Sequence, residues 1–347
     1  MAFDKMIVKK LLKKFDDVPF VVKFPDGEEF KVGEGEPQAI IRANGGIDMG
    51  AVMKSPSLAL GEAYMDKTLE LEKGDLFEIL NMVLAKLEDF ASDFSGLTKI
   101  MKTSTSKKNQ KQEIATHYDI GNEFFELWLD ETMSYSCGYF KHETDTLYDA
   151  QVHKVEHILK KLNLKEGQTL LDIGCGWGYL LIAAAKKYHV KGVGITLSEE
   201  QYKKGQERIK AEGLEGQVEI RLMDYRDLEK SGMTFDRIVS VGMLEHVSRD
   251  NYPLFFKNID KVLNKKGIVL LHYISGRQEH DGDPWIKKYI FPGGIIPSLR
   301  EIIYLIGEYN YYTLDVESLR RHYEKTLLEW SKNYAAKRDV IDTMFEE

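Results

Sequence analysis

From about residue 113 onward, short apolar stretches alternate with longer amphipathic ones. The apolar stretches have the length and composition of buried strands, and the amphipathic ones have helical periodicity. The expected strands are Thr169–Ile173, Gly192–Leu197, Val218–Met223, Arg237–Val241 and Ile268–Ile274. The expected helices between them include Tyr179–Tyr188, Glu199–Ala211 and Tyr252–Val262. This alternation predicts an α/β domain with a doubly wound, mostly parallel sheet and right-handed crossovers.

The first hundred residues follow a different pattern. Residues 3–15 have apolar side chains on one face at helical spacing, and lysines crowd the other side. The apolar positions are Phe3, Ile7, Leu11 and Phe15, and the lysines are Lys9, Lys10, Lys13 and Lys14. The simpler interpretation is that the apolar face packs on its own domain. The alternative is that the lysines attract anionic lipid headgroups.

Residues 20–32 predict a hairpin, with two short strands joined by a tight turn at Pro25-Asp26-Gly27. A helical tract from Leu76 to Phe90 closes this region. Residues 96–112 are polar and rich in lysine, which is typical of a linker. We therefore expect an N-terminal lipid-associated or dimerisation domain over residues 1–95 and a second domain over residues 113–347.

Composition limits the classes of protein to consider. The chain has 347 residues, of which 43% are hydrophobic and 30% charged, so it can form two cores. A net charge of −8 argues against general affinity for nucleic acid. The two cysteines, Cys137 and Cys175, and the lack of a signal peptide or a long apolar run predict a cytoplasmic chain with reduced thiols.

Residues 171–178 read Leu-Asp-Ile-Gly-Cys-Gly-Trp-Gly, so an apolar strand runs into three glycines at alternate positions and then into a helix. Glycine permits sharp turns and lets a ligand approach the backbone closely. Doubly wound proteins use such a unit to hold a nucleotide-containing cofactor at the end of the first strand. The spacing is G-x-G-x-G rather than the dinucleotide G-x-G-x-x-G, and by itself it leaves the identity of the cofactor open.

The ends of the other strands favour a cofactor other than a dinucleotide. A dinucleotide enzyme is expected to have an acidic residue at the end of the second strand. Here that strand ends at Thr196, with Gln201 one turn into the next helix. Tyr225, after the third strand, offers a flat ring suited to an adenine. Glu245 and His272 would each be unremarkable alone, but together they follow neighbouring strands and predict a polar site at this edge.

Eight sequence blocks, in family order, resemble the cyclopropane fatty acid synthase family with its mycolic acid cyclopropane synthase relatives. The blocks are His117–Asn122, Met133–Phe140, Leu171–Gly178, Gly194–Gln201, Glu245–Val247, Leu270–His272, Tyr289–Gly294 and His322–Trp330. They cover roughly the last two-thirds of the chain. Each block is unspecific alone, and the set together is highly specific.

The resemblance implies a Rossmann-like class I methyltransferase fold with a smaller N-terminal α+β domain, and S-adenosylmethionine as the cofactor. The cofactor-binding residues that it implies are Tyr135, Ser136, Asp172, Gly174, Cys175, Gly176, Trp177, Gly178, Thr196, Leu197, Ser198, Gln201, Tyr225 and Arg226. It implies no metal.

The resemblance also implies a bound bicarbonate ion as general base. The residues that would hold it are Cys137, Glu245, His272, the backbone of Ile274, and Tyr323. A sulfonium methyl is electrophilic enough for a cis alkene if both are aligned in a dry cavity. The transfer leaves a carbocation, and a base aimed at the new methyl group then directs ring closure. Cys137 is expected to contact the anion and not to act as a nucleophile.

Aromatic faces stabilise such a cation. The candidates are Tyr139, Tyr273, Tyr289 and Phe291, and the histidines expected to be structural are His117, His246 and His322.

We therefore expect a cyclopropane-fatty-acyl-phospholipid synthase, cytoplasmic and bound peripherally at the inner face of the membrane. Its expected partners are a phospholipid bilayer, an unsaturated phospholipid substrate and a second copy in a homodimer. The alternatives are a related C-methyltransferase that closes no ring and an inactive lipid-binding relative. Family members usually continue beyond Glu347 with a further helix and a final strand, so a C-terminally truncated chain is also expected.

Overall fold

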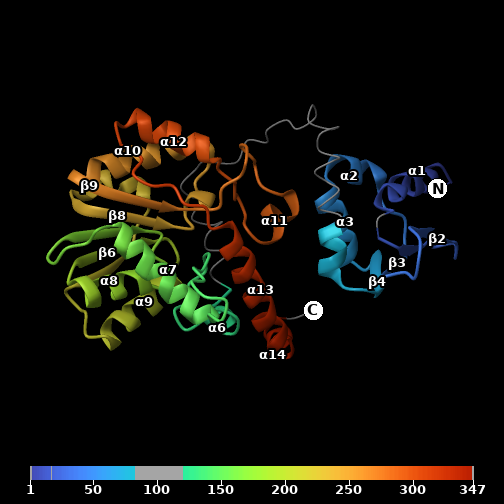
Figure 1. Cartoon of the computed structure of the whole chain (residues 1–347), viewed down its shortest axis with the longest axis horizontal. Coiled ribbons are helices and arrows are strands. Elements are labelled where there is room, and N and C mark those ends of the chain that lie inside the picture. The colour runs from blue at the N-terminus through green and yellow to red at the C-terminus, as the bar shows by residue number, and fades with distance from the viewer. Residues whose placement is uncertain (1, 17, 83–119, 346–347) are drawn as a thin grey trace. The chain divides into compact units, whose positions relative to one another are not determined.

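The computed structural model describes residues 2–16, 18–82 and 120–345 (Figure 1). The predicted helix over residues 76–90 is present from residue 76 to residue 82, and its remainder lies outside the described residues. The predicted linker, residues 96–112, and His117 lie outside them too.

The chain divides into two compact units. The N-terminal unit comprises Met1–Lys102 and the short segment Asp283–Tyr289, and the C-terminal unit comprises Thr103–Gly282 and Ile290–Glu347. The segment Asp283–Tyr289 therefore interrupts the C-terminal unit in sequence.

The N-terminal unit contains a four-stranded sheet in the order β2-β1-β3-β4. Its strands are β1 (Phe20–Lys23), β2 (Glu29–Val32), β3 (Ala39–Ala43) and β4 (Leu69–Lys73). β1 and β2 form the predicted hairpin, with Phe20 opposite Val32, and Gly27 takes a φ of 83° in the turn. β1 also pairs with β3 in parallel.

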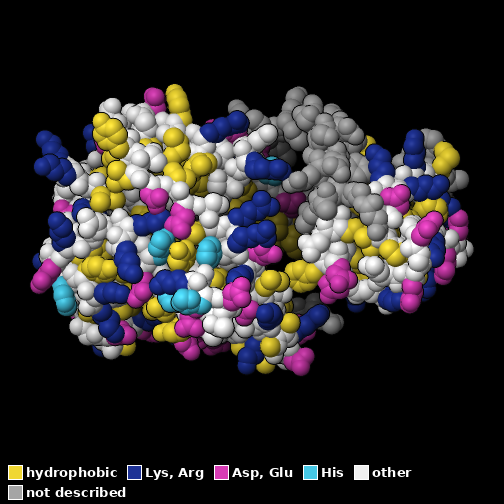
Figure 2. Space-filling model, in the orientation of Figure 1, with side chains coloured by type: hydrophobic (Ala, Val, Ile, Leu, Met, Phe, Trp, Pro, Cys, Tyr) yellow, Lys and Arg dark blue, Asp and Glu magenta, His cyan; other side chains and the backbone are white. Residues whose placement is uncertain are grey.

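Helix α1 (Ala2–Leu12) and the turn after it pack on the core of their own unit. Leu12 and Phe15 contact a cluster built around Phe20, while the side chains of Phe3, Ile7 and Leu11 lie outside the described part. Lys9 forms an ion pair with Glu28. The simpler interpretation of this helix therefore agrees with the described contacts. Figure 2 shows lysine and arginine interspersed with acidic side chains on this unit.

This unit also contains the helices α2 (Met49–Lys54) and α3 (Pro56–Met65), and the segment α11 (Pro284–Tyr289) packs on α3. A methyl group at Gly61 of α3 would lie 2.4 Å from the ring of Trp285 in α11. The packing of α11 on α3 therefore requires glycine at position 61. The Tyr289 hydroxyl donates a hydrogen bond of 2.8 Å to Glu62.

The C-terminal unit is built on a five-stranded, all-parallel sheet in the order β7-β6-β5-β8-β9. Its strands are β5 (Thr169–Ile173), β6 (Lys191–Thr196), β7 (Val218–Leu222), β8 (Phe235–Val241) and β9 (Leu263–His272). All five predicted strands and the parallel sheet are confirmed. The last strand was predicted to reach Ile274, but it ends at His272 because the Ile274 N–H bonds to Glu245 Oε1 instead of a strand.

Helices cover both faces of this sheet (Figure 1). The helices are α6 (Asn122–Glu126), α7 (Leu147–Lys161), α8 (Tyr179–Tyr188), α9 (Glu199–Ala211), α10 (Tyr252–Val262), α12 (Leu299–Glu308), α13 (Arg320–Ala336) and α14 (Arg338–Met344). The predicted α8, α9 and α10 have the predicted bounds.

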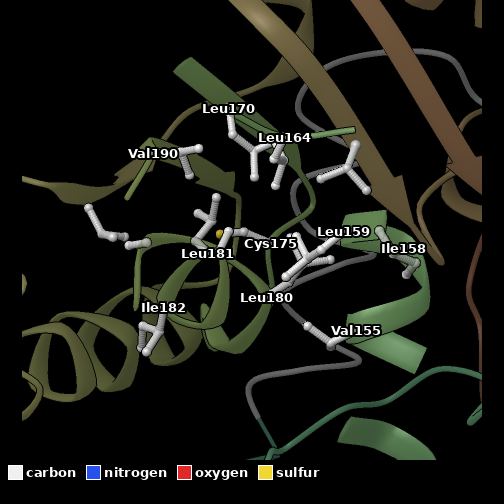
Figure 3. Packing of buried hydrophobic residues seen from close by; sticks show 14 of the residues in the cluster. Val155, Ile158, Leu159, Leu164, Leu170, Cys175, Leu180, Leu181, Ile182 and Val190 are labelled. Atoms are coloured by element: carbon white, nitrogen blue, oxygen red, sulfur yellow. The ribbon is translucent and has the colours of Figure 1, made fainter. Parts of the chain in front are cut away.

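Successive residues of a strand point to opposite faces, and the core follows this rule. Leu170 and Val239 pack with α7 and α8 in a first cluster, part of which Figure 3 shows around Leu181 and Cys175. Leu171 and Ile238 pack with α10 in a second cluster. Two apolar layers thus enclose the sheet and fix its strand ends.

The strand order reverses next to β5, which pairs with β6 on one side and with β8 on the other. Ligands of doubly wound proteins bind at the carboxyl ends of the strands beside such a reversal. In the part of the chain that the structure describes, no helix is both long and apolar enough to cross a membrane.

The close contact between β6 and the glycine loop predicts how a substitution at Gly194 changes the stability of the fold. A methyl group at Gly194 would lie 2.7 Å from Cys175 Sγ and 2.8 Å from Leu181 Cδ1. Gly194→Ala should therefore overpack this layer and lower the free energy of unfolding by about 1–3 kcal/mol. Gly307→Ala in α12 is the control, because nothing lies within 4 Å of its added methyl group. Urea denaturation measures both, and an unchanged stability of Gly194→Ala would contradict the predicted clash.

Candidate active site

The glycine loop joins β5 to α8 with three residues in the left-handed region. Gly174, Gly176 and Gly178 have φ values of 81°, 54° and 82°. A methyl group at Gly178 would lie 2.8 Å from Ile220, whereas nothing lies within 4 Å of one at Gly176. The N–H groups of Gly174 and Cys175 donate to the carbonyl of Ile195 at 3.0 and 3.1 Å. The loop is thus fixed to the end of β6, and α8 begins from a glycine.

A cavity lies beside this loop, at the carboxyl ends of β5, β6 and β8. The predicted cofactor residues that line it are Tyr135, Ser136, Asp172, Gly174, Cys175, Gly176, Trp177, Thr196, Leu197, Gln201 and Tyr225. These residues come from distant parts of the sequence, and the parallel sheet brings them together.

Three predicted cofactor residues do not line the cavity and instead position their neighbours. Gly178 is the N-cap of α8. The Ser198 hydroxyl caps α9 by accepting a 3.2 Å hydrogen bond from the Gln201 N–H. The guanidinium of Arg226 binds both carboxylate oxygens of Asp224, at 2.8 and 2.6 Å.

At the end of β6, the Thr196 hydroxyl donates to Gln201 Oε1 at 2.8 Å, and both residues are buried. This bond uses one acceptor position of the amide oxygen and fixes the orientation of the amide, so its N–H donors are available to a ligand. Neither side chain is charged, as the sequence predicts for a site that is not built for a dinucleotide.

Tyr225 is buried beside the cavity, and its ring packs edge-on against Phe255 with centroids 5.3 Å apart. Burial raises the pKa of its phenol, so the hydroxyl stays protonated. That hydroxyl is buried and meets no hydrogen-bond partner among the described residues. A buried polar group without a partner is costly, which suggests that a ligand completes it.

Glu245 lies in the turn η4 (Leu244–His246) that follows β8. Its Oε1 accepts a 2.6 Å hydrogen bond from the Ile274 N–H. Its Oε2 is buried and has no partner within the described part of the chain. Burial raises the pKa of this carboxyl to about 7. The group is therefore protonated for part of the time near neutral pH and can then donate from Oε2.

His272 ends β9, directly beside the end of β8, because Val241 pairs with it in register. Its carbonyl accepts a 2.8 Å hydrogen bond from Gly242. Burial, aided by the charge of Lys154, lowers the pKa of its imidazole to about 4, so the ring is neutral. Its Nδ1 is buried and also meets no partner among the residues described.

Cys137 and Tyr323 belong to the same region. Burial raises the pKa of the Cys137 thiol to about 11, so this group is a neutral thiol and not a nucleophile. Its Sγ lies 3.8 Å from the carbonyl of Leu319, the residue that precedes α13. Burial, followed by the charge of Glu245, raises the pKa of the Tyr323 phenol. Glu245 Oε1 binds the Ile274 N–H, and the charges of Glu245 and Cys137 act on the Tyr323 phenol, so these four predicted anion-binding positions lie in one region. The fifth, His272, ends the strand beside β8, the strand that precedes Glu245.

Helix α13 is attached to the segment that carries Cys137. The Gly138 N–H donates to Thr326 Oγ1 at 2.9 Å, and the Phe140 N–H donates to His322 Nδ1 at 3.0 Å. The ring of Tyr139 stacks on His322 with centroids 4.8 Å apart. His322 is thus structural, as expected, and it positions the helix of Tyr323.

The aromatic candidates separate into different environments. Phe291 stacks on Tyr135 with centroids 6.1 Å apart and lies 5.6 Å from the ring of His246. Tyr139 and Tyr289 are engaged with His322 and Glu62 instead. His246, expected to be structural, lines the cavity, which the sequence could not show because the turn that aims it depends on tertiary contacts.

The sequence reasoning did not select Lys154, which lies on α7 and lines the cavity. It is buried, although lysine is rarely buried without a partner. A lysine on the apolar face of an amphipathic helix was the available signal.

Comparison with known sequences assigns residues 105–347 to the family described as mycolic acid cyclopropane synthetase. The match covers more than half of the chain. The chain belongs to this family. A second model, described as a domain of unknown function (DUF7884), matches residues 7–95.

Relatives span most of the chain. A protein of Escherichia coli named cyclopropane-fatty-acyl-phospholipid synthase is 41% identical over 319 residues, which are 90% of this chain and 81% of that protein. A protein of Pseudomonas putida named "Probable fatty acid methyltransferase" is 40% identical over 323 residues, 91% of this chain and 81% of that protein.

Among solved structures, mycolic acid cyclopropane synthase CmaA1 complexed with SAH and CTAB is similar with a TM-score of 0.64 and 34% identity. The match covers 68% of this chain and 87% of that one. With the parallel sheet and its glycine loop, these similarities make this family member an enzyme, a methyltransferase with the Rossmann-like class I fold.

The buried carboxyl of Glu245 should make the stability of the folded chain depend on pH. Its pKa in the folded chain is about 7, against 4.5 ordinarily, so the folded state retains a proton that the unfolded state releases between these values. The proton bound to Glu245 thus contributes to the free energy of unfolding. This contribution is fully present below pH 4.5 and is lost as the pH rises to about 7. The total loss in the free energy of unfolding is about 3 kcal/mol. Glu245→Gln should therefore gain stability relative to the wild type over that interval.

Denaturant unfolding of both proteins at pH 4.5 and pH 7.5 measures this difference. The contributions of His272 and other groups cancel in the comparison. Glu212→Gln is the control, because this carboxylate lies at the surface, where it pairs with Lys186 at 2.7 Å. A stability difference between Glu245→Gln and wild type that is the same at both pH values would show that the carboxyl is not protonated by burial.

Proposed function

We propose that the chain transfers a methylene group from S-adenosylmethionine to a cis double bond of a phospholipid acyl chain, with bound bicarbonate as general base. The observation that carries this proposal is the pair of unpartnered buried atoms, Glu245 Oε2 and His272 Nδ1, at adjacent strand ends in the same unit as the glycine loop. The name of the Escherichia coli relative supports the substrate class.

The cavity beside the glycine loop fits the cofactor by its chemistry. The glycines expose backbone to a ligand, and the Tyr225 hydroxyl and the Gln201 amide offer polar groups without charge. Asp172 adds a buried carboxylate at the end of β5. When bound, S-adenosylmethionine supplies an electrophilic methyl group and bicarbonate supplies the base for its proton.

The anion site fits bicarbonate by its protonation states. An anion beside an ionised carboxylate would be repelled, but burial raises the pKa of Glu245 enough for its Oε2 to carry a proton. The Cys137 thiol and the Tyr323 phenol are neutral donors for the same reason. In this proposal His272 is neutral and donates from Nδ1, a tautomer that the anion itself would select.

Ring closure requires that water does not reach the carbocation first. Tyr135, Phe291 and His246 form a contiguous set of rings next to the cavity. These rings exclude water, and the aromatic faces of Tyr135 and Phe291 attract positive charge, by on the order of 1–2 kcal/mol each. This apolar wall is where we propose that the alkene lies.

The test is mass spectrometry of lipids from a host that lacks cyclopropane lipids and expresses the chain. The expected product carries one extra CH₂ per acyl chain and has lost its double bond. Glu245→Ala should lower the yield of this product by about 100-fold or more, because the Oε2 donor that would hold the bicarbonate and the Oε1 acceptor of the Ile274 N–H are both removed. Glu212→Ala should match the wild type. A wild-type chain that adds no CH₂, or a Glu245→Ala variant with full activity, would contradict the proposal.

The same experiment tests a second function, methyl transfer without ring closure, because the Pseudomonas putida relative is named a probable fatty acid methyltransferase. Methyl transfer without ring closure would add the same CH₂ in a branch. Ozonolysis distinguishes a methyl-branched alkene, which is cleaved, from a cyclopropane, which is not.

We further propose that the chain works at a bilayer surface, bound by lysines of the N-terminal unit. Lys10, in α1, and Lys13, in the turn after it, are exposed. Each lysine near an anionic surface contributes about 1 kcal/mol, so Lys10→Ala with Lys13→Ala should weaken binding about 10-fold or more.

Sedimentation with phosphatidylglycerol vesicles at rising salt measures this binding. Lys203→Ala, an exposed position on α9 of the other unit, is the matched control. Binding that is insensitive to salt and to removal of both lysines would exclude this surface.

A further inference from the structure

Lys154 is buried in the wall of the cofactor cavity, where none of the sequence motifs accounts for it. It is 4% exposed, and it lies in the middle of α7. Its Nζ donates a 2.9 Å hydrogen bond to Ser136 Oγ. A buried ammonium is retained where its charge has a partner or a task.

The helix holds Lys154 in a fixed position against the segment Ser134–Ser136. α7 begins with a capping box between Thr146 and Asp149, which fixes its start. One turn before Lys154, the fully buried Gln151 donates to the carbonyls of Ser134 and Ser136 at 3.2 and 2.9 Å. The same helix face thus binds both the backbone and the side chain of this segment.

The bond from Lys154 decides what the Ser136 hydroxyl can do. A hydroxyl has one donor and two acceptor positions. Because the ammonium occupies an acceptor position, the O–H of Ser136 is available to donate to a negatively charged ligand group. An ammonium nearby further favours such an anion.

Asp172 supplies the opposite charge in the same cavity. It is 3% exposed, and its Oδ1 is buried without a hydrogen-bond partner among the described residues. Burial raises the pKa of Asp172 to about 7, and the charge of Lys154 opposes that rise. Burial likewise lowers the pKa of Lys154 to about 8, against the charges of Asp130 and Asp172. Each charge therefore favours the ionised form of the other group, against the burial that disfavours both.

We propose that Lys154 is a positioning residue for the zwitterionic amino-acid end of the cofactor. It turns the Ser136 hydroxyl toward the ligand carboxylate and favours the ionised form of Asp172, so that Oδ1 accepts a hydrogen bond from the ligand's ammonium group. This inference rests on S-adenosylmethionine being the cofactor. Lys154 thereby sets the preference for ligands that carry the amino-acid end over ligands that lack it.

Isothermal titration with two probes tests this assignment. S-adenosylhomocysteine has the amino-acid end, and 5′-methylthioadenosine keeps the adenosine and the sulfur without it. Lys154→Met should weaken S-adenosylhomocysteine about 10- to 100-fold, as expected for the loss of a hydrogen-bonded charge, and change methylthioadenosine less than about 3-fold. The control is Lys161→Met on the same helix, which forms surface ion pairs with Asp315 and Glu317 and should change neither affinity.

Ser136→Ala is a second variant, which removes both the acceptor of the Lys154 ammonium and the hydroxyl that would donate to the ligand. It should also reduce the preference for S-adenosylhomocysteine, and its effect should be less than additive with that of Lys154→Met. If Lys154→Met fails to fold, the loss of preference in Ser136→Ala at unchanged methylthioadenosine affinity supports the assignment, and a retained preference overturns it.

Two results overturn the role of Lys154 while leaving the proposed function intact. One is that the wild-type chain and the Lys154→Met variant bind S-adenosylhomocysteine with equal affinity. The other is an equal loss for both probes, which indicates a merely structural role. A wild-type chain that binds neither probe overturns the cofactor itself and this inference with it.

Discussion

The parallel pairing of β8 with β5 and β9 is the constraint on which the candidate site depends. This pairing aligns Asp172 with Val239 and Val241 with His272, so the three strands end at one edge. The glycine loop, Glu245 and His272 are separated by long stretches of sequence and meet for this reason alone. Apolar layers on both faces of the sheet hold the register, because a shift by one residue would turn Leu170 and Leu171 to the wrong sides.

Burial at that edge gives the site its chemistry. The oxygens Asp172 Oδ1 and Glu245 Oε2 and the nitrogen His272 Nδ1 are removed from water without partners in the described chain. The same desolvation raises the pKa of both acids and lowers that of the imidazole. Such desolvation costs free energy, and perturbed groups of this kind cluster at functional sites, where a bound ligand offsets the cost. Acidic, neutral and cationic groups thus coexist there near neutral pH.

Helices α7 and α13 connect the two halves of the site. The segment from Ser134 to Phe140 is bound by α7 through Gln151 and Lys154, and by α13 through Thr326 and His322. Residues that face the cofactor cavity and residues near the anion site therefore lie on one restrained segment. This arrangement explains why the segment carries no regular secondary structure and is nevertheless well packed.

Periodicity, turn residues and motif spacing are local properties, and they were enough to predict the parallel sheet, the hairpin, the glycine loop and the family. The sequence also selected eleven of the residues that line the cavity. Only the folded chain shows that β9 ends at His272, that His246 lines the cavity, that Tyr289 bonds to Glu62, and that Lys154 lies beside Ser136. These outcomes depend on contacts between segments far apart in the chain and on desolvation by several elements at once. Local sequence patterns predict neither the contacts nor the desolvation.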